Sequence, residues 1–351
     1  MTGHDFIHPD MREAARNENI IIELTNRCNS NCSFCFARAG ISDFRDLPEN
    51  TVNDIIREAR EAGYTGLHLT GGEPFLWEPL YRTLELASGL GYRSVLINSN
   101  GSLLDRTACK RIRDTNAAVR LSISLHGPAE YHEKFRGTGS WGRTLRGLEC
   151  SLEENIPVHI FTTVGKSLVP VIPWFVKDTF NQFPGIRTVT LIQIIRILQS
   201  IPGIEEELLA PADFISMVKS VSLLSLYGLR VNILENPLAR TASILMGMPW
   251  LPPSPPLQRA GRITFMADGT MTLSHSSRTP IGSYGKGAIK KVLNSDSYRQ
   301  GVSPDRLTCP QCRHFKHCTA GGMIRPSDTQ RGPGNGSRFC SDVLDLAAGQ
   351  Q

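Results

Sequence analysis

Short apolar runs alternate with longer amphipathic stretches along most of the chain, from about Ile20 to about Ile233. The runs have the length of β-strands, and the stretches between them have apolar residues at helical spacing. We expect strands over 20–25, 65–69, 94–98, 119–125, 158–164 and 188–194, and helices over 47–63, 79–90, 104–114, 141–154, 171–181 and 211–227. Strands that alternate with helices of this length are typical of βαβ units with a parallel sheet. The pattern predicts an α/β fold arranged as a partial (β/α)6 barrel, whose functional residues would follow the strand ends.

The alternating pattern stops at a proline-rich segment, residues 249–256. Prolines at this density oppose helix formation and favour extended chain. Beyond it, two short apolar runs flank Asp268-Gly269, which predicts a β-hairpin with a tight turn. We therefore expect a barrel over 18–235, a stiff connector over 236–256 and a second, smaller unit over 257–345.

Composition and cysteine usage narrow the class of protein. The chain has 351 residues, 40% of them hydrophobic, which is ample for a packed core. Its nine cysteines are clustered, and the N-terminus shows no secretory signal. This combination favours metal ligation over disulfides and a cytoplasmic, reducing setting. No apolar run has the length needed to span a bilayer, so we expect no membrane association.

The net charge of +5 comes from scattered basic residues rather than from a block. A nucleic-acid partner is therefore not favoured. A mildly basic surface would serve an anionic cofactor or substrate.

The densest cysteine group is Cys28-x3-Cys32-x2-Cys35, directly after the first expected strand. Three thiolates this close can hold three irons of a [4Fe–4S] cube and leave the fourth iron open to an external ligand. The alternative is a zinc knuckle. An aromatic residue, Phe34, precedes the last cysteine of the group.

Three further motifs stand where expected strands end. They are Thr-Gly-Gly-Glu-Pro at 70–74, Asn-Ser-Asn-Gly at 98–101, and Ser-Leu-His-Gly at 124–127, which is followed by Arg136-Gly137. With the cysteine loop, these motifs resemble the radical S-adenosylmethionine (SAM) enzymes. The resemblance implies that SAM binds the open iron and is cleaved reductively to a 5′-deoxyadenosyl radical. That radical would abstract a hydrogen atom from the substrate.

The resemblance also implies roles for single residues. It places Phe34, Gly71, Gly72, Glu73, Pro74, Asn100, Ser124 and Thr163 at the SAM site. Arg136 would approach the SAM carboxylate or the substrate. His126 stands where many members of the family have Asp, and it is a candidate acid or base; the alternative is a histidine that is simply hydrogen-bonded in a loop. Gln193 and Arg196, at the end of the sixth strand, are weaker candidates for the substrate side.

A second cysteine group lies near the C-terminus, at Cys309, Cys312, Cys318 and Cys340. Four cysteines suit a Cys₄ zinc site or a fully ligated Fe–S cluster. Together with the hairpin, they resemble the C-terminal half of the SPASM (twitch-type) domain. This implies one auxiliary [4Fe–4S] cluster that transfers electrons. Ser274 and His275 occupy the place of the first SPASM cysteine, so the other auxiliary cluster is expected to be absent.

Two cysteines remain, Cys109 and Cys150, both in expected helices. Helix cysteines are usually small core residues; the alternative is that one of them donates a hydrogen atom to a substrate radical.

The function expected from the resemblance is hydrogen abstraction from an unactivated C–H bond. A reductant such as flavodoxin or ferredoxin would supply the electron. The first expected strand begins close to the N-terminus, so we expect no leader-peptide-binding domain before it. This favours a small-metabolite or natural-product precursor as substrate over a ribosomal peptide delivered by a separate partner. Two other classes stay open: an RNA-modifying enzyme and a non-catalytic metal-binding regulator.

Overall fold

A computed structural model describes residues 15–16, 18–35, 37, 39–40, 43–195, 203–255, 257–276, 278, 280–302, 314 and 338–349. In this part of the chain, one open sheet has the strand order β10-β9-β8-β1-β2-β3-β4-β5-β6-β7. The parallel strands are β1 (Asn19–Glu23), β2 (Gly66–Thr70), β3 (Ser94–Ser99), β4 (Val119–Ser124), β5 (Val158–Val164), β6 (Thr188–Gln193) and β7 (Val231–Ile233). The partial barrel is confirmed, and β7 is a parallel strand that the sequence pattern did not predict.

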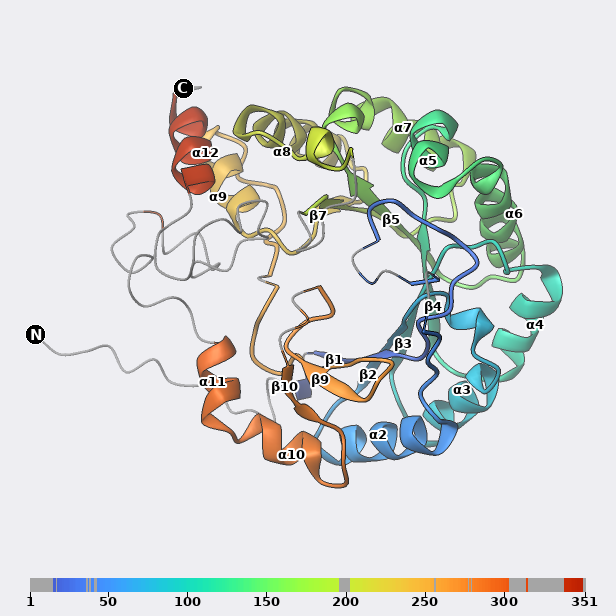
Figure 1. Cartoon of the computed structure of the whole chain (residues 1–351). Helices are drawn as coiled ribbons and strands as arrows, with labels where there is room; N and C mark the ends of the chain where they lie inside the picture. The colour runs from blue at the N-terminus through green and yellow to red at the C-terminus, as the bar shows by residue number, and fades with distance from the viewer. Residues whose placement is uncertain are drawn as a thin grey trace, which may run out of the picture.

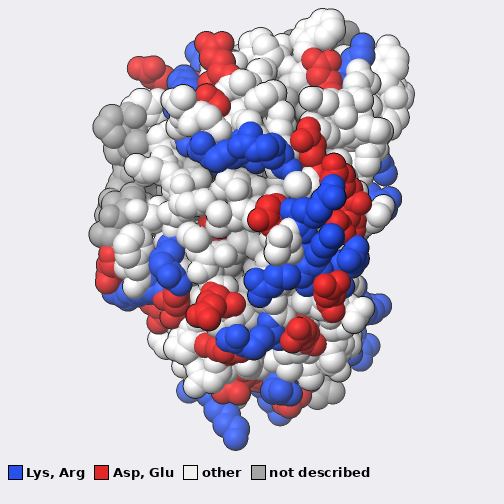
Figure 2. Space-filling view, turned by 90° about the vertical axis from the view of Figure 1, so that its right-hand side faces the viewer, with Lys and Arg blue, Asp and Glu red and all other residues white. Residues whose placement is uncertain are grey.

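Helices surround the outer face of the curved sheet, as Figure 1 shows. They are α2 (Glu49–Glu61), α3 (Leu80–Gly89), α4 (Arg106–Asp114), α5 (Ala129–Arg136), α6 (Ser140–Glu153), α7 (Ile172–Gln182) and α8 (Pro211–Leu226). Short 3-10 turns cover Pro74–Leu76, Lys166–Val171 and Glu205–Glu207. All six expected helices form, and α5 is an additional one. In Figure 2, basic and acidic side chains lie beside one another on the face that carries α4 and α6. Arg106 and Glu153 pair there at 2.7 Å, in agreement with scattered charge.

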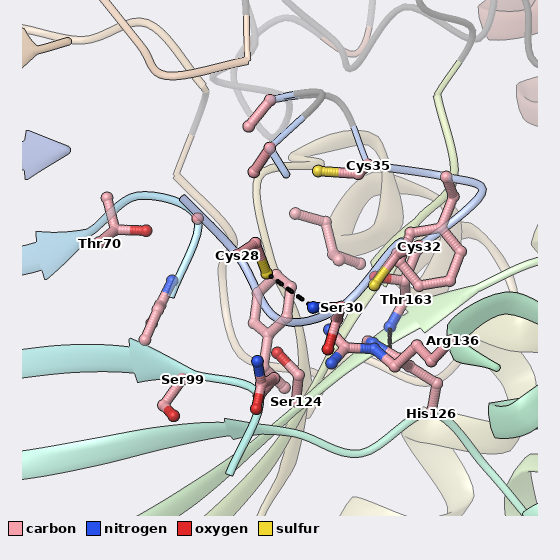
Figure 3. A pocket seen from close by; sticks show the side chains of 18 of the residues that line it. Cys28, Ser30, Cys32, Cys35, Thr70, Ser99, Ser124, His126, Arg136 and Thr163 are labelled. Atoms are coloured by element: carbon pink, nitrogen blue, oxygen red, sulfur yellow. Dashed lines mark hydrogen bonds between the residues drawn. The ribbon is translucent and has the colours of Figure 1, made fainter. Parts of the chain in front are cut away.

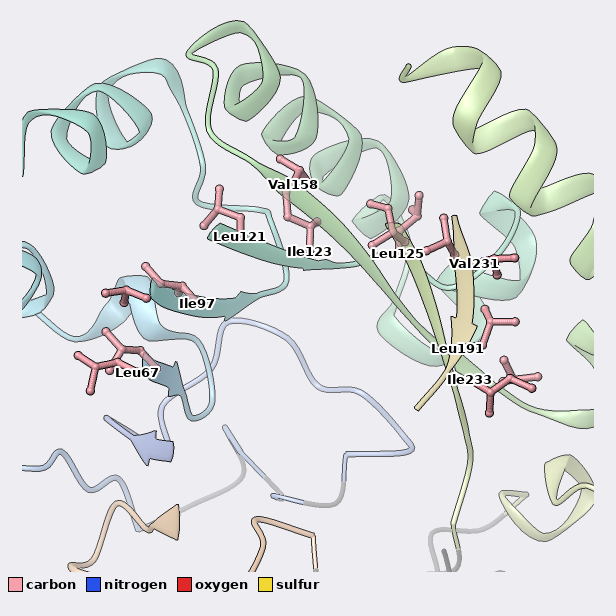
Figure 4. Close-up of a cluster of buried hydrophobic side chains, with 14 of the residues drawn as sticks. Leu67, Ile97, Leu121, Ile123, Leu125, Val158, Leu191, Val231 and Ile233 are labelled. Atoms are coloured by element: carbon pink, nitrogen blue, oxygen red, sulfur yellow. The ribbon is translucent and has the colours of Figure 1, made fainter. Parts of the chain in front are cut away.

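The two faces of the strands differ in chemistry. Residues that point toward the helices are apolar and fully buried, such as Leu67, Ile97 and Leu121 (Figure 4). Burial of each such side chain contributes about 1.5–3 kcal/mol to folding. The alternate residues point inward, and many are polar, such as His68 and Arg120. Closed barrels fill their interior with branched apolar side chains, whereas this one keeps a polar interior with room for a ligand.

The segment expected as a connector is partly helical. Helix α9 (Leu238–Leu245) lies within residues 236–256 and packs against α8 and against α12 (Arg338–Ala348). This helix lies before the proline-rich segment 249–256, for which extended chain was expected, and the prolines that oppose a helix are concentrated after residue 248. The proline-rich part itself has no regular secondary structure where it is described.

The expected hairpin is present as β8 (Thr264–Phe265) and β9 (Thr270–Thr272), with Gly269 in the turn at φ +81°. It continues into β10 (Pro280–Ser283), α10 (Ala288–Leu293) and α11 (Asp296–Val302). Strand β8 pairs in parallel with β1. The hairpin therefore extends the barrel's own sheet. Within the described residues, no helix is long and apolar enough to cross a membrane.

Candidate active site

The three N-terminal cysteines line one cavity at the carboxyl ends of the strands. The cavity encloses about 1070 Å³, including its open mouth. In Figure 3 the thiols of Cys28, Cys32 and Cys35 surround a common space. The loop that carries them is held at its centre, where the Ser33 N–H donates to the Phe135 carbonyl over 3.0 Å. Helix α5, which supplies Phe135, thus supports the cysteine loop.

The Gly-Gly-Glu-Pro turn after β2 packs directly on the chain that leads into the cysteine loop. The N–H of Gly72 donates to the Thr25 carbonyl at 2.7 Å, and the N–H of Glu73 donates to the Arg27 carbonyl at 2.8 Å. A Cβ atom at Gly72 would lie 2.0 Å from the Arg27 oxygen. A side chain at this position would therefore force the two backbones apart, which explains the glycine.

The carboxylate of Glu73 fastens this turn to β3. It accepts hydrogen bonds from the Ser99 hydroxyl at 2.9 Å and from the Asn100 N–H at 2.8 Å. Burial raises the pKa of Glu73 to about 7, although these hydrogen bonds oppose the rise. The side chain is fully buried and is not part of the cavity wall. Neither is Pro74, which begins the turn at Pro74–Leu76.

Asn100, in the Asn-Ser-Asn-Gly segment at the end of β3, connects this segment to the cysteine loop. Its Nδ2 donates to Asn29 Oδ1 at 2.7 Å, and its Oδ1 accepts from the N–H of Ser102 at 2.8 Å. Asn29 in turn donates to the Ser102 hydroxyl at 2.9 Å. Asn100 also lines the cavity, so it both lines the site and positions the loop.

His126 is held as a neutral ring with a defined tautomer. Its Nδ1 accepts the Thr163 N–H at 2.8 Å, so the ring proton sits on Nε2. Burial, with a further contribution from Arg136, lowers the pKa of His126 well below its ordinary value. Its Nε2 finds no hydrogen-bond partner among the described residues. The ring lines the cavity and meets the Phe34 ring edge-on, with the two ring centroids 5.0 Å apart.

The predicted site residues mostly come together here. Within the described residues, the cavity wall includes Cys28, Cys32, Phe34, Cys35, Gly71, Gly72, Asn100, Ser124, His126, Arg136, Thr163 and Gln193. Three of the distal cysteines, Cys309, Cys312 and Cys318, and also Arg196, lie outside the described residues. Cys340 lies on α12 and is partly buried. Cys109 and Cys150 do not reach the cavity wall.

Other cavity residues were not predicted from the sequence. They are Ser30, Ala37, Ala39, Phe161, Ile192, Ile194, Ile195 and His275. Strand alternation identifies Phe161, because it shares a face of β5 with Thr163. His275 follows the hairpin, and its approach to the barrel depends on the pairing of β8 with β1.

The cavity suits a cluster with three thiolate ligands. Burial raises the pKa of Cys28 to about 11 and also raises that of Cys32, where Arg136 opposes the rise. Thiolates there need a positive partner, which iron supplies. No group of three Cys, His, Asp or Glu side chains among the described residues is arranged around a single metal ion.

The fold and the cavity define an open α/β barrel with a three-cysteine loop at the carboxyl ends of its strands. Residues 22–169 match the family model of the Radical SAM superfamily. The chain therefore carries a radical SAM domain over these residues. A [4Fe–4S] cluster and SAM are the cofactors of this family. That Cys28, Cys32 and Cys35 ligate the cluster stays a prediction.

Curated relatives match part of the chain. It is 34% identical over 162 residues to an AdoMet-dependent heme synthase of Oleidesulfovibrio alaskensis, which covers 45% of this chain and 40% of the relative. It is 32% identical to an Fe-coproporphyrin III synthase of Methanosarcina barkeri, over 44% of this chain and 39% of the relative. A probable GTP 3',8-cyclase of Saccharolobus islandicus is 27% identical, over 50% and 57%. The matches thus span roughly half the length of these relatives or less.

Solved structures resemble nearly the whole fold. Native anSMEcpe with bound AdoMet has a TM-score of 0.71 at 16% identity, covering 95% of this chain and 100% of that chain. SuiB of Streptococcus suis bound to the precursor peptide SuiA has a TM-score of 0.67 at 16% identity, covering 89% and 76%. At this identity the likeness shows the fold alone.

Proposed function

We propose that this protein is a radical SAM enzyme that abstracts a hydrogen atom from a C–H bond of a small metabolite. The observation that supports this most is the single cavity that gathers the three cysteines, the glycine turn, Ser124 and Arg136. In this family the bound cluster and SAM supply a 5′-deoxyadenosyl radical when an electron is delivered. The electron would come from a protein such as flavodoxin or ferredoxin.

The chain's own residues hold and orient these groups. Cys28, Cys32 and Cys35 would ligate three irons, and the backbone of Gly71 and Gly72 faces the same cavity. The guanidinium of Arg136 lines the cavity, and its buried Nε has no hydrogen-bond partner among the described residues. It would bind a carboxylate of SAM.

His126 would donate from Nε2 to SAM or to the substrate and hold it in place. A ring kept neutral by burial is a poor proton acceptor at neutral pH. Its role is therefore orientation rather than acid–base exchange.

The substrate class is proposed from the relatives. Their names refer to heme, Fe-coproporphyrin III and GTP, which are small molecules. The alternative is a ribosomal peptide, since one neighbour in fold is titled as bound to a precursor peptide. We also propose that Cys309, Cys312, Cys318 and Cys340 bind one auxiliary [4Fe–4S] cluster.

The test of the function is 5′-deoxyadenosine formation by the anaerobically reconstituted and reduced protein. Cys28→Ala should abolish it and lower the iron content by about four atoms per chain. Cys150→Ala is the matched control, because Cys150 is off the cavity, and it should leave both quantities unchanged. Product formation by Cys28→Ala would contradict the site assignment. A wild type with intact clusters and no 5′-deoxyadenosine would contradict the function.

The auxiliary site has a separate test. Cys309→Ala should also lose about four irons per chain while the signals of the N-terminal cluster persist. Zinc bound at these four cysteines of the wild type, in place of iron, would contradict the auxiliary cluster without affecting the main proposal.

A further inference from the structure

A second cavity lies inside the barrel, nearer the amino ends of the strands than the cavity that the cysteines line. It encloses about 980 Å³, including its opening. The two cavities share four wall residues, Asn98, Phe161, Ile192 and His275. The second cavity continues toward the amino ends of the strands, where its wall includes Arg120 of β4 and His159 of β5. The two cavities therefore adjoin one another inside the barrel.

Arg120 is a cation without a carboxylate partner in the described part of the chain. Its Nη2 donates to the Ser94 hydroxyl at 2.6 Å, and its buried Nε has no hydrogen-bond partner there. Two other arginines in this wall are neutralised: Arg262 pairs with Glu235 at 2.7 Å, and Arg259 forms an ion pair with Glu18. Leaving a guanidinium donor buried and unsatisfied costs free energy. An incoming anion would recover that cost.

The surroundings of Arg120 are positive as well. Burial, followed by the charges of Arg120, Arg187 and Arg230, lowers the pKa of His159. His159 Nδ1 lies 2.8 Å from the Thr188 hydroxyl, so the ring is held at the cavity wall. Three guanidinium groups close enough to oppose protonation of one histidine create a field that attracts anions.

We propose that Arg120 binds an anionic group of the substrate, a carboxylate or a phosphate, while the rest of the molecule reaches the cysteine cavity. This deepens the proposed function and rests on it. Arg120 and Ser124 are separated by four residues along β4, which corresponds to roughly 13 Å. The substrate is therefore an elongated acid of about that reach. A guanidinium fork suits bidentate recognition of either kind of anion.

Anaerobic crystals of the reconstituted holoprotein soaked in sodium bromide test this proposal. We expect an anomalous bromide peak within hydrogen-bond distance of Arg120, which inorganic phosphate and acetate each displace. Displacement by phosphate alone would assign a phosphorylated substrate, and displacement by acetate alone a carboxylic acid. Absence of an anion at Arg120 would overturn the proposal.

Two variants show whether the site depends on Arg120. Arg120→Gln should reduce the bromide occupancy at least tenfold, whereas Arg120→Lys, which keeps the charge, should retain a weaker peak. Arg93→Gln is the matched control, because Arg93 is an exposed arginine before β3 outside this wall. An undiminished peak in Arg120→Gln would also overturn the proposal. The measurement needs no SAM cleavage, so a protein that binds the anion but yields no 5′-deoxyadenosine fails only the proposed function.

Discussion

Gly72 packs directly on the backbone that leads into the cysteine loop. A methyl group there would meet the Arg27 carbonyl at 2.0 Å, and neither backbone can move without breaking the two hydrogen bonds between them. We expect Gly72→Ala to destabilise the protein by roughly 1–3 kcal/mol and to lower the iron content after reconstitution. Thermal unfolding and iron analysis would measure both effects.

Gly89 provides the control for Gly72. It is the last residue of α3, and no atom lies within 4 Å of a Cβ built on it. Gly89→Ala should leave stability within about 1 kcal/mol of the wild type or raise it. Equal behaviour of the two variants would mean that the close approach at Gly72 does not constrain the loop.

Glu73 should give the protein a distinct dependence on pH. Its pKa in the folded chain is about 7, above its ordinary value of 4.5. Between these values the unfolded chain has already lost the proton that the folded chain retains, so stability falls as pH rises. We expect the unfolding midpoint of the wild type to fall relative to that of Glu73→Gln between pH 5 and pH 8. A constant difference over this range would show that Glu73 is not held protonated.

His126 should influence binding without imposing a titration. Because burial keeps its pKa well below 6.5, the rate of 5′-deoxyadenosine formation should show the same pH profile from 6 to 8 in the wild type and in His126→Phe. The variant loses the acceptor of the Thr163 N–H and the Nε2 donor, so we expect SAM to bind about tenfold more weakly. An inflection near neutral pH that disappears in His126→Phe would instead establish acid–base catalysis.

At the scale of elements, strand alternation adds to what the motifs predict. Residues of one parity in β5, Val158 and Ile160, pack under the helices, and those of the other parity, His159, Phe161 and Thr163, face the cavities. The sequence predicted the strands, and the motifs after them predicted most of the cavity wall. The alternation of side chains along β5 would also have predicted Phe161 in the cavity wall.

Helix α5 shows where local pattern fails. It spans eight residues, and its buried side chains include Tyr131 and Phe135. Isolated helices of this length are marginal in water, so its stability comes from packing. The Tyr131 hydroxyl accepts the Gly165 N–H at 2.7 Å, and the Phe135 carbonyl holds the cysteine loop. Such long-range contacts leave no periodic trace in the sequence.

At the scale of the whole molecule, the barrel was predictable and the attachment of the C-terminal part was not. Proline content suggested a separation before residue 257, but a strand edge offers unpaired N–H and C=O groups to any extended segment. Strand β8 takes that place on β1, with Ile21 opposite Thr264. Helix α12 packs on α8 and α9 from the other side. Pairing between segments so distant in sequence depends on the folded barrel rather than on local composition.

This attachment predicts that the barrel will not fold alone. A chain ending at Glu235 would expose the edge of β1 and the side of α8 that α12 covers, and it would lack the buried Phe265 and Tyr298. We expect it to aggregate or to lose cooperative unfolding, because an uncovered strand edge promotes intermolecular pairing. Size-exclusion chromatography and thermal unfolding followed by circular dichroism would show this. A monomeric 1–235 chain that unfolds in one cooperative transition would instead establish the barrel as a domain that is stable by itself, and would reduce the β8–β1 pairing to a contact between independent units.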